Sequence, residues 1–388
     1  MAQLVCSQCK AVYQSDAPTC PRCKAQGDQV YDFDQSDEYL QREAQRIVEE
    51  RRQAGLDGLV GDLAAVIINV EPDRLRPAVQ ELLATTGLHH RHGYETDRFT
   101  THILTAPQGA DFLLRSRKQD NPFQPYNDHP KARHLPNTRL ETFIFETKDL
   151  DSYLEIQRER GLAFMTDEPV ETERYRYLQT PPSEYTGNAL GFIEWKHGQP
   201  DFTRPAAEAI DWQPEKPDRA YLDNIGKLDH TATRVTAGQR DKAIIEFLEY
   251  TNYHFDFAIY VKTFNSITTV ARLSSDAYAM VFTSGIAPYK NDEVSGPTER
   301  FIHNYGKRVH HMAFHTEHIQ DTFAGLREDG MEYLIELVGS PDEGLRQTFT
   351  MPSDHTLLVN EYIHRYGDFD GFFTRSNVTK LTEATTRQ

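Results

Sequence analysis

One arrangement of strand-like and helix-like segments recurs four times along the chain, and it constrains the fold more than any other feature. In each copy, an apolar run suited to a β-strand is followed by a polar turn, an amphipathic helical segment and further alternating strands. The four apolar runs are LAAVIINV (63–70), LETFIFET (140–147), LDHTATRV (228–235) and VHHMAFHT (309–316). Repetition of one unit predicts a fold assembled from its copies. We therefore expect an α+β fold of four βαβββ units.

Two Pro-rich segments lie between the repeated units. The segment at 121–137 joins the first two units, and the segment at 199–218 separates the two halves of the chain. A charged helical pattern at 37–56 precedes the units, with Leu40, Ile47 and Val48 on one side. We expect it to pack the ribbon onto the main body or to connect the two, with a solvated linker helix as the default interpretation. The predicted organisation is a ribbon at 1–30, a helical linker at 31–60, and two domains at 61–200 and 224–388.

All four cysteines lie near the N-terminus, in two Cys-x2-Cys pairs: Cys6, Cys9, Cys20 and Cys23. Two such pairs place four thiolates around one tetrahedral Zn(II) ion. Two disulfides are the alternative, which an intracellular compartment disfavours. Because four thiolates leave no open position on the ion, we expect a structural zinc ribbon or one that docks a protein partner.

Composition excludes several classes of partner. The net charge of −17 and the pI near 5.4 disfavour a general nucleic-acid-binding surface. The sequence has no apolar run of the roughly 20 residues that a membrane-spanning helix needs. The N-terminal MAQLVCSQCK lacks the apolar stretch of a signal peptide. We expect a cytoplasmic protein that binds neither nucleic acid nor membrane, and the sequence leaves a homo-oligomer open.

Two histidines and a glutamate occupy comparable places in the second half. His230 lies on the first expected strand of the third unit, His311 on the first strand of the fourth unit, and Glu361 on its last strand. Two neutral imidazoles and one carboxylate suit non-haem Fe(II) and leave open positions for substrate and O2. We expect these three side chains to converge inside one curved sheet and to bind the metal.

The first half provides an internal comparison. Aligning the units places Val66 opposite His230 and Thr142 opposite His311, whereas Glu194 preserves an acidic residue opposite Glu361. We therefore expect that the first half binds no metal.

The segment KRVHHMAFHTEHI (307–319) holds three further histidines. Strand alternation predicts that His310 points to the face opposite His311 and packs or hydrogen-bonds there. His315 lies on the same face as His311 but further along the strand. One interpretation is that it contacts a metal ligand without binding the metal itself. His318 falls in the turn before the next helix, where we expect it to be exposed.

The second half resembles the vicinal oxygen chelate superfamily and, within it, is similar to 4-hydroxyphenylpyruvate dioxygenase and its relatives. LDHTATRV resembles the first-ligand strand of that family, and VHHMAF resembles its second-ligand strand, a match that selects His311 over His310. EYIHRYGDFDGFFTRSNVTKLTEA (361–384) resembles the third-ligand strand and the closing C-terminal helix. The resemblance covers about 224–388 well and 60–200 only as fold.

The resemblance also implies pocket residues. LRQTFT (345–350) is similar to a family segment that carries an active-site glutamine and a phenylalanine, here Gln347 and Phe349, and Phe373 matches an aromatic that lines the pocket. His310 stands where the family has a substrate-contacting glutamine.

Several family positions carry other residues. Positions that contact substrate in the family fall at or near Pro297, Ser284 and Val378 in this sequence. The spacing of the ligands also differs: only 50 residues separate His311 from Glu361, which is closer to the spacing in extradiol ring-cleaving dioxygenases. The resemblance thus implies iron chemistry on a substrate other than 4-hydroxyphenylpyruvate.

The activity implied is an Fe(II)-dependent dioxygenase that couples O2 to oxidative decarboxylation and hydroxylation of a 2-oxo acid, which chelates the metal through its carboxylate and keto oxygens. Gln347 would hydrogen-bond the substrate, and Phe349 and Phe373 would keep water from the site. Three alternatives stay open: an extradiol dioxygenase that cleaves a catechol, a non-redox isomerase or lyase using another divalent ion, and a binding or regulatory protein.

Overall fold

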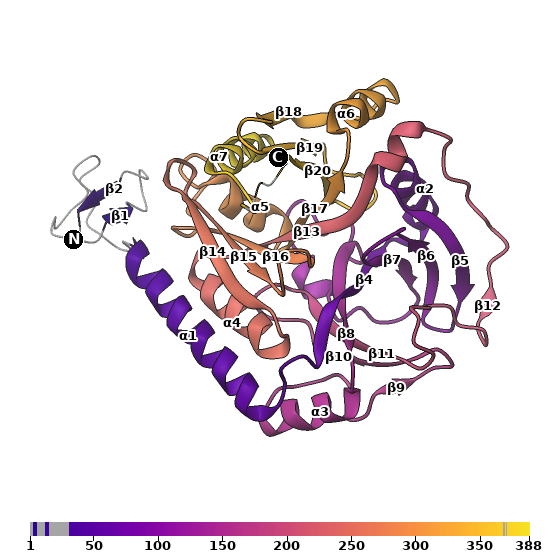
Figure 1. The fold of residues 1–388 in the computed structure, drawn as a ribbon. Coiled ribbons are helices and arrows are strands. Elements are labelled where there is room, and N and C mark those ends of the chain that lie inside the picture. Colours follow the sequence, from indigo (N-terminus) through magenta and orange to yellow (C-terminus); the bar gives the residue numbers. More distant parts are fainter. Residues whose placement is uncertain (1–2, 6–11, 15–30, 368, 370) are drawn as a thin grey trace.

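The structure is a computed structural model that describes residues 3–5, 12–14, 31–367, 369 and 371–388 (Figure 1). The cysteines of the expected zinc ribbon lie outside the described residues, so the zinc site stays a prediction. Three short strands pair near the N-terminus: β1 (Gln3–Val5), β2 (Val12–Gln14) and β3 (Tyr31–Asp32). No helix among the described residues is long and apolar enough to cross a membrane.

The first half of the chain forms a nine-stranded mixed sheet within the described region. Its strands, in spatial order, are β12 (Glu208–Ala209), β5 (His89–Glu95), β6 (Phe99–Thr105), β7 (Asp111–Arg117), β4 (Val60–Val70), β8 (Arg139–Thr147), β11 (Ala189–Trp195), β10 (Tyr175–Gln179) and β9 (Val170–Glu171).

The second half forms an eight-stranded mixed sheet of the same design. Its strands, in spatial order, are β14 (His254–Val261), β15 (Ser266–Arg272), β16 (Ala279–Gly285), β13 (Ile225–Val235), β17 (Arg308–Thr316), β20 (Val359–Arg365), β19 (Leu345–Thr350) and β18 (Tyr333–Ser340). In each sheet the two long central strands pair antiparallel, and each of them pairs parallel with the last strand of its own unit.

Four helices complete the repeated units, and three lie outside them. The helices are α1 (Phe33–Ala54), α2 (Leu75–Thr85), α3 (Leu150–Glu159), α4 (Arg240–Tyr250), α5 (Pro297–Tyr305), α6 (Ile319–Glu328) and α7 (Arg375–Ala384). Helices α2, α3, α4 and α6 each follow the first strand of a unit and precede its other three strands. The prediction of four βαβββ units is therefore confirmed.

A pair of buried arginines joins the two halves at matching positions. Arg139 begins β8 and Arg308 begins β17. Arg139 donates to the carbonyl of Lys307, and Arg308 donates to the carbonyl of Thr138, so each strand is bonded to the residue that precedes the other. Both side chains are almost fully buried, and their hydrogen bonds to carbonyl oxygens offset part of the cost of burying a cation.

Helix α1 packs against the second half, which corrects the expectation of a solvated linker. Leu40 and Ile47 are fully buried, and α1 runs beside α4 and β14 (Figure 1). The Arg51 guanidinium donates to the carbonyl of Leu248 at the C-terminal end of α4, and to those of Thr251 and Tyr253 just beyond it. A cation is favourable at that end of a helix, where carbonyls are left unpaired. Val48, expected on the same side as Leu40, is instead exposed.

A cavity of about 260 Å³ lies between the halves and is lined by both of them, for example by Phe143 and Phe282. Glu246 of α4 faces this cavity and accepts a hydrogen bond from the Ser183 hydroxyl. Burial raises the pKa of Glu246 from 4.5 to about 7. The carboxyl group is therefore held in its neutral form at mildly acidic pH.

This shift has a measurable consequence for stability. Because the folded pKa lies above the unfolded one, the stabilisation by Glu246 is complete below pH 4.5 and is lost as the pH rises to about 7. The shift corresponds to about 3 kcal/mol. Because glutamine cannot ionise, we expect the Glu246→Gln variant to lack this pH dependence. Between pH 4.5 and 7, the unfolding free energy of the wild type should therefore fall by about 3 kcal/mol more than that of the variant. Urea titrations at both pH values measure the difference, with exposed Glu155→Gln as the matched control. Equal pH dependence in wild type and variant would contradict the assignment.

Candidate metal centre

Three adjacent strands of the second sheet bring His230, His311 and Glu361 together. In the register of these strands, Ala313 of β17 lies opposite both His230 of β13 and Glu361 of β20, and His311 lies two residues before it. One donor atom from each of the three side chains lies within 4.8 Å of the other two. Among the described residues, this is the group of His, Cys, Asp and Glu side chains whose geometry could hold a metal ion.

The distances in this triad match ligands that share one ion. Glu361 Oε2 lies 3.2 Å from His230 Nε2 and 3.3 Å from His311 Nε2. Ligands at the usual 2.0–2.2 Å from a metal, at right angles, lie about 3 Å apart. His230 Nε2 is buried and accepts or donates no hydrogen bond. A buried imidazole nitrogen in this state fits a coordination position.

The other ring nitrogen of His230 is bound by its neighbour in the chain. His230 Nδ1 lies 2.7 Å from Asp229 Oδ2, and Arg365 makes two bonds of 2.6 and 3.0 Å to the Asp229 carboxylate. Burial alone would raise the pKa of Asp229, but the Arg365 cation and His230 hold it well below its usual range. The carboxylate therefore stays ionised and accepts from Nδ1–H, so Nε2 is the ring nitrogen that faces Glu361.

The pKa of His230 reflects its two carboxylates. Burial opposes the charged imidazolium, but the Glu361 and Asp229 carboxylates outweigh burial and raise the pKa of His230 to about 9. This electrostatic environment favours a cation at Nε2. A divalent ion at the same place satisfies the two carboxylates in the same way.

His310 points toward the site, which corrects the expectation that it faces away from His311. Ala232 of β13 pairs with His311, and the next residue, Thr233, pairs with Val309, so His310 is the extra residue of a β-bulge. A bulge interrupts strand alternation and re-aims side chains. His310 therefore borders the same cavity as His311.

Hydrogen bonds through His310 fix the tautomer of His311. His310 Nε2 lies 2.8 Å from Gln388 Oε1, an oxygen that only accepts, so Nε2 donates and Nδ1 accepts. His310 Nδ1 lies 2.8 Å from His311 Nδ1, which must then be the donor. Burial lowers the pKa of both rings well below 6.5, so both are neutral near pH 7. His311 Nε2 thus keeps its lone pair and faces Glu361.

Gln347 binds the glutamate of the triad. Gln347 Nε2 donates to Glu361 Oε1 over 2.5 Å, and Asn377 of α7 donates to Gln347 Oε1 over 2.9 Å. Glu361 Oε1 is therefore occupied, and Oε2 is the oxygen that faces both histidines. Gln347 also lines the cavity that contains the triad, so the substrate contact implied by the resemblance stays a prediction.

Aromatic rings enclose the triad. The Phe349 ring centroid lies 4.7 Å from that of His311, and Phe373 and Phe372 lie 5.1 and 5.4 Å from His230. Phe349 and Phe373 border a cavity of about 50 Å³, which Glu361 and His311 also line. Phe372, which the sequence did not single out, packs against both His230 and Phe373.

The rest of the cavity wall comes from α7, from α5 and from strands β13, β15 and β16 of the same sheet. Val378 and Leu381 of α7 line it, and α7 contacts β14, β18 and β19. Thr283 of β16 lines the cavity, whereas Ser284, expected near a contact position, does not. Pro297 places its carbonyl 3.5 Å from Arg234, a cavity residue that the sequence did not single out.

The remaining histidines of this segment lie outside the triad. His315 is half-buried and its Nε2 lies 3.6 Å from Glu317. His318 is exposed, as expected, and adopts a left-handed conformation (φ 44°) just before α6. The structure therefore brings His311 and His310 to the site and leaves His315 and His318 apart from it.

The first half has other residues at the equivalent positions. The register of β4, β8 and β11 places Ala65, Thr142 and Gly191 where the second half has His230, His311 and Glu361. The sequence alignment of Val66 with His230 is therefore wrong by one residue: Val66 is buried in the core on the other face of β4. A Cβ on Gly191 would lie 2.6 Å from the Tyr177 hydroxyl oxygen, so Tyr177 fills this place.

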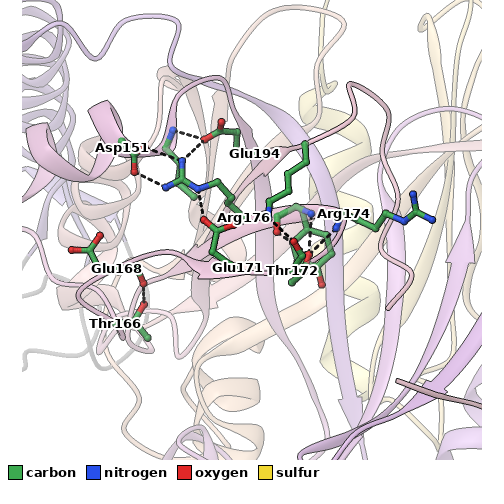
Figure 2. Close-up of polar contacts among 11 residues, drawn as sticks. Asp151, Thr166, Glu168, Glu171, Thr172, Arg174, Arg176 and Glu194 are labelled. Atoms are coloured by element: carbon green, nitrogen blue, oxygen red, sulfur yellow. Dashed lines mark hydrogen bonds and ion pairs between the residues drawn. The ribbon is translucent and has the colours of Figure 1, made fainter. Parts of the chain in front are cut away.

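Glu194 is likewise not the counterpart of Glu361. It pairs with Arg176 at 3.2 Å and accepts from the backbone N–H of Leu150 at the start of α3. Figure 2 shows Arg176 between Glu194, Asp151 and Glu171, a cluster at the N-terminal end of α3. Glu194 therefore stabilises a helix N-terminus.

Comparisons with known proteins address the fold. No family model matches the chain, and no curated protein does. Solved structures do match. A triple mutant of 4-hydroxymandelate synthase from Streptomyces coelicolor is similar over 84% of this chain and 98% of its own, with a TM-score of 0.65 and 17% identity. A xylose isomerase-like TIM barrel/4-hydroxyphenylpyruvate dioxygenase fusion protein matches over 90% of this chain, with a TM-score of 0.58 and 13% identity. This chain spans 58% of the fusion protein. These likenesses and the two mixed sheets establish that the chain has the vicinal oxygen chelate fold.

Proposed function

We propose that this protein is a non-haem Fe(II) dioxygenase that couples O2 to the oxidative decarboxylation and hydroxylation of a 2-oxo acid. His230, His311 and Glu361 are the proposed ligands. One observation carries the proposal. Each of the three side chains has one polar atom hydrogen-bonded to a neighbouring residue. Its other polar atom is directed at the common site, where Glu361 Oε2 lies 3.2 Å from His230 Nε2 and 3.3 Å from His311 Nε2. Two imidazoles and a carboxylate are the donors that suit non-haem Fe(II).

Iron in this position would supply open coordination sites for the 2-oxo acid and O2. The protein's own residues prepare the site. Asp229 and His310 fix the two imidazole tautomers, and Gln347 holds Glu361. Phe349, Phe372 and Phe373 form an apolar wall that excludes water from the reacting groups.

The test uses the full chain, purified without O2 and loaded with Fe(II). Uptake of O2 and release of CO2 are measured over a panel of 2-oxo acids and catechols. Stoichiometric coupling of CO2 to O2 is the expected result. O2 uptake with a ring-cleaved product and no CO2 would favour the extradiol alternative, which the 50-residue spacing from His311 to Glu361 supports. Absence of O2 uptake with every compound would refute both.

We further propose that 61–200 and 224–388 act as two domains and that the second carries the iron. Cys6, Cys9, Cys20 and Cys23 are the proposed ligands of a separate structural Zn(II) at the N-terminus. About one zinc per chain is expected by elemental analysis, lost when Cys6 and Cys9 are both changed to Ser. Iron content unchanged in that variant would separate the two sites.

The role of His310 leads to a specific prediction. His310→Phe removes the acceptor for His311 Nδ1–H and should lower Fe(II) affinity by about 10- to 100-fold, the usual cost of losing an outer partner of a metal-binding histidine. His310→Gln keeps an acceptor oxygen and should retain most of the affinity. Competition with a chromogenic chelator measures both. Equal affinities for His310→Phe and the wild type would show that the bond to His311 has no part in metal binding.

A further inference from the structure

Arg234 lies beside the proposed metal centre but takes no part in it. It follows His230 by four residues on β13, so both side chains point to the same face of the strand, with Cα atoms about 13 Å apart. It is 4% exposed and borders the cavity that contains His311 and Glu361. A cationic side chain therefore forms part of the wall that a substrate would meet.

The charge of Arg234 is not neutralised by the protein. Within the part of the chain that the structure describes, no carboxylate forms an ion pair with it, and its one hydrogen bond is a long contact of 3.5 Å to the carbonyl of Pro297. The guanidinium lies over the Phe301 ring, 4.4 Å from its centroid. Burial lowers the pKa of Arg234 to about 9, which still leaves it charged at neutral pH. A buried cation without a counter-ion is costly unless a ligand supplies one.

Hydroxyl groups line the same cavity as this cation. They belong to Ser266, Thr268, Thr283 and Thr298. Thr283 Oγ1 is buried and has no hydrogen-bond partner, and Ser266 and Thr298 make only a long contact of 3.5 Å with each other. These groups can therefore donate to an acceptor placed between them. A buried cation together with unengaged hydroxyl donors gives this cavity a polar surface suited to an anion.

We propose that Arg234 and the neighbouring hydroxyls bind a second carboxylate of the substrate, so that the substrate is a short 2-oxo dicarboxylic acid. This rests on the proposed function, in which the 2-oxo acid end occupies the metal. A carboxylate fits because its two oxygens match the paired N–H groups of a guanidinium. The cavity volume of about 50 Å³ favours a small group over a bulky one. Arg234 is then a specificity-determining residue.

The test compares 2-oxo acids that differ only in the terminal carboxylate. Binding of 2-oxoglutarate and 2-oxopentanoate, and of 2-oxoadipate and 2-oxohexanoate, is measured by calorimetry on the Fe(II)-loaded protein without O2. We expect the wild type to prefer at least one diacid over its partner by about 30-fold or more. Arg234→Gln should reduce that preference to about 3-fold or less, mainly by weakening the diacid. Arg327→Gln, a paired and exposed arginine, is the matched control.

Thermal unfolding provides an independent measurement. Because Arg234 is a buried, unpaired cation, Arg234→Met should raise the Tm of the ligand-free protein. A purely structural arginine would give a lower Tm and an unchanged diacid preference. A wild type with no preference within either pair, or a preference that Arg234→Gln retains, overturns the proposal.

A metal-free arm separates this proposal from the proposed function. If the protein binds no iron, glutarate and pentanoate are titrated into the metal-free chain and followed by NMR. Glutarate binding that is lost in Arg234→Gln would support the carboxylate site while the iron chemistry fails. Equal responses to glutarate and pentanoate would refute the site independently of the iron.

Discussion

His311→Ala is expected to lower the affinity for Fe(II) by more than about 100-fold and to abolish O2 uptake. Loss of an outer partner of a metal ligand typically costs 10- to 100-fold, and loss of the ligand itself costs more. His311 Nε2 is the only donor that β17 contributes to the triad, and two remaining ligands hold an ion weakly. Anaerobic competition with a chromogenic chelator gives the affinity, and an oxygen electrode gives the turnover.

His315→Ala is the matched control for this experiment. It removes the same side chain from the same strand, but His315 contacts Glu317 outside the triad. It should bind Fe(II) as the wild type does. His311→Ala also leaves His310 Nδ1 without its partner, so circular dichroism and Tm must show that the variant is folded. A folded His311→Ala protein that keeps one tightly bound iron per chain would refute the ligand assignment.

The repeated units could be predicted because their signals are local. Strand and helix patterns are visible within 10 to 20 residues, and each unit carries the same sequence of them. The convergence of His230, His311 and Glu361 follows from placing equivalent strands side by side. These parts of the fold and the site depend on periodicity and on repetition, both of which the sequence contains.

The bulge at His310 could not be predicted, and it caused the error at that residue. A bulge inserts one residue into a strand and shifts every later residue to the other face. Regular alternation therefore turned His310 away from His311. The match of Val66 to His230 has a different origin: the runs 63–70 and 228–235 carry equivalent bulges and align without a gap, with Ala65 opposite His230, so Val66 is one residue too far along. Glu194 was matched by its acidity, whereas the strand register gives Gly191. The partners of Arg234 are also set by long-range packing that leaves no local pattern.

In the second half, bulges place two residues where they can orient the proposed metal ligands. Asp229 is the extra residue of one bulge, between the pairs Leu228–Phe314 and His230–Ala313, and His310 is the extra residue of another. Each immediately precedes a proposed ligand and hydrogen-bonds its Nδ1. Neighbours in a regular strand point to opposite faces and could not meet in this way. The two bulges thus let each ligand be oriented by its own neighbour. Comparable bulges occur in the first half, at Ala64 and Glu141, where no histidine follows.

Asp229→Asn is expected to weaken both the metal site and the fold. The substitution keeps the size of the side chain but removes the charge that binds Arg365 and accepts from His230. Metal affinity should fall by about 10- to 100-fold because the orientation of His230 is less well fixed. The free energy of unfolding should fall by about 3 kcal/mol, since removing one partner of a buried ion pair leaves the other uncompensated. Asp329→Asn, in the exposed pair with Arg219, should cost less than about 1 kcal/mol.

A second substitution separates these two effects. In Asp229→Asn/Arg365→Gln both charges are absent, so no buried cation is left unpaired and much of the lost stability should return. Metal affinity should stay low, because Arg365 acts on His230 only through Asp229. Urea unfolding and chelator competition on the four proteins of this cycle measure the two quantities independently. If the double variant recovers both, Asp229 serves only to neutralise Arg365, and His230 is oriented by the surrounding phenylalanines.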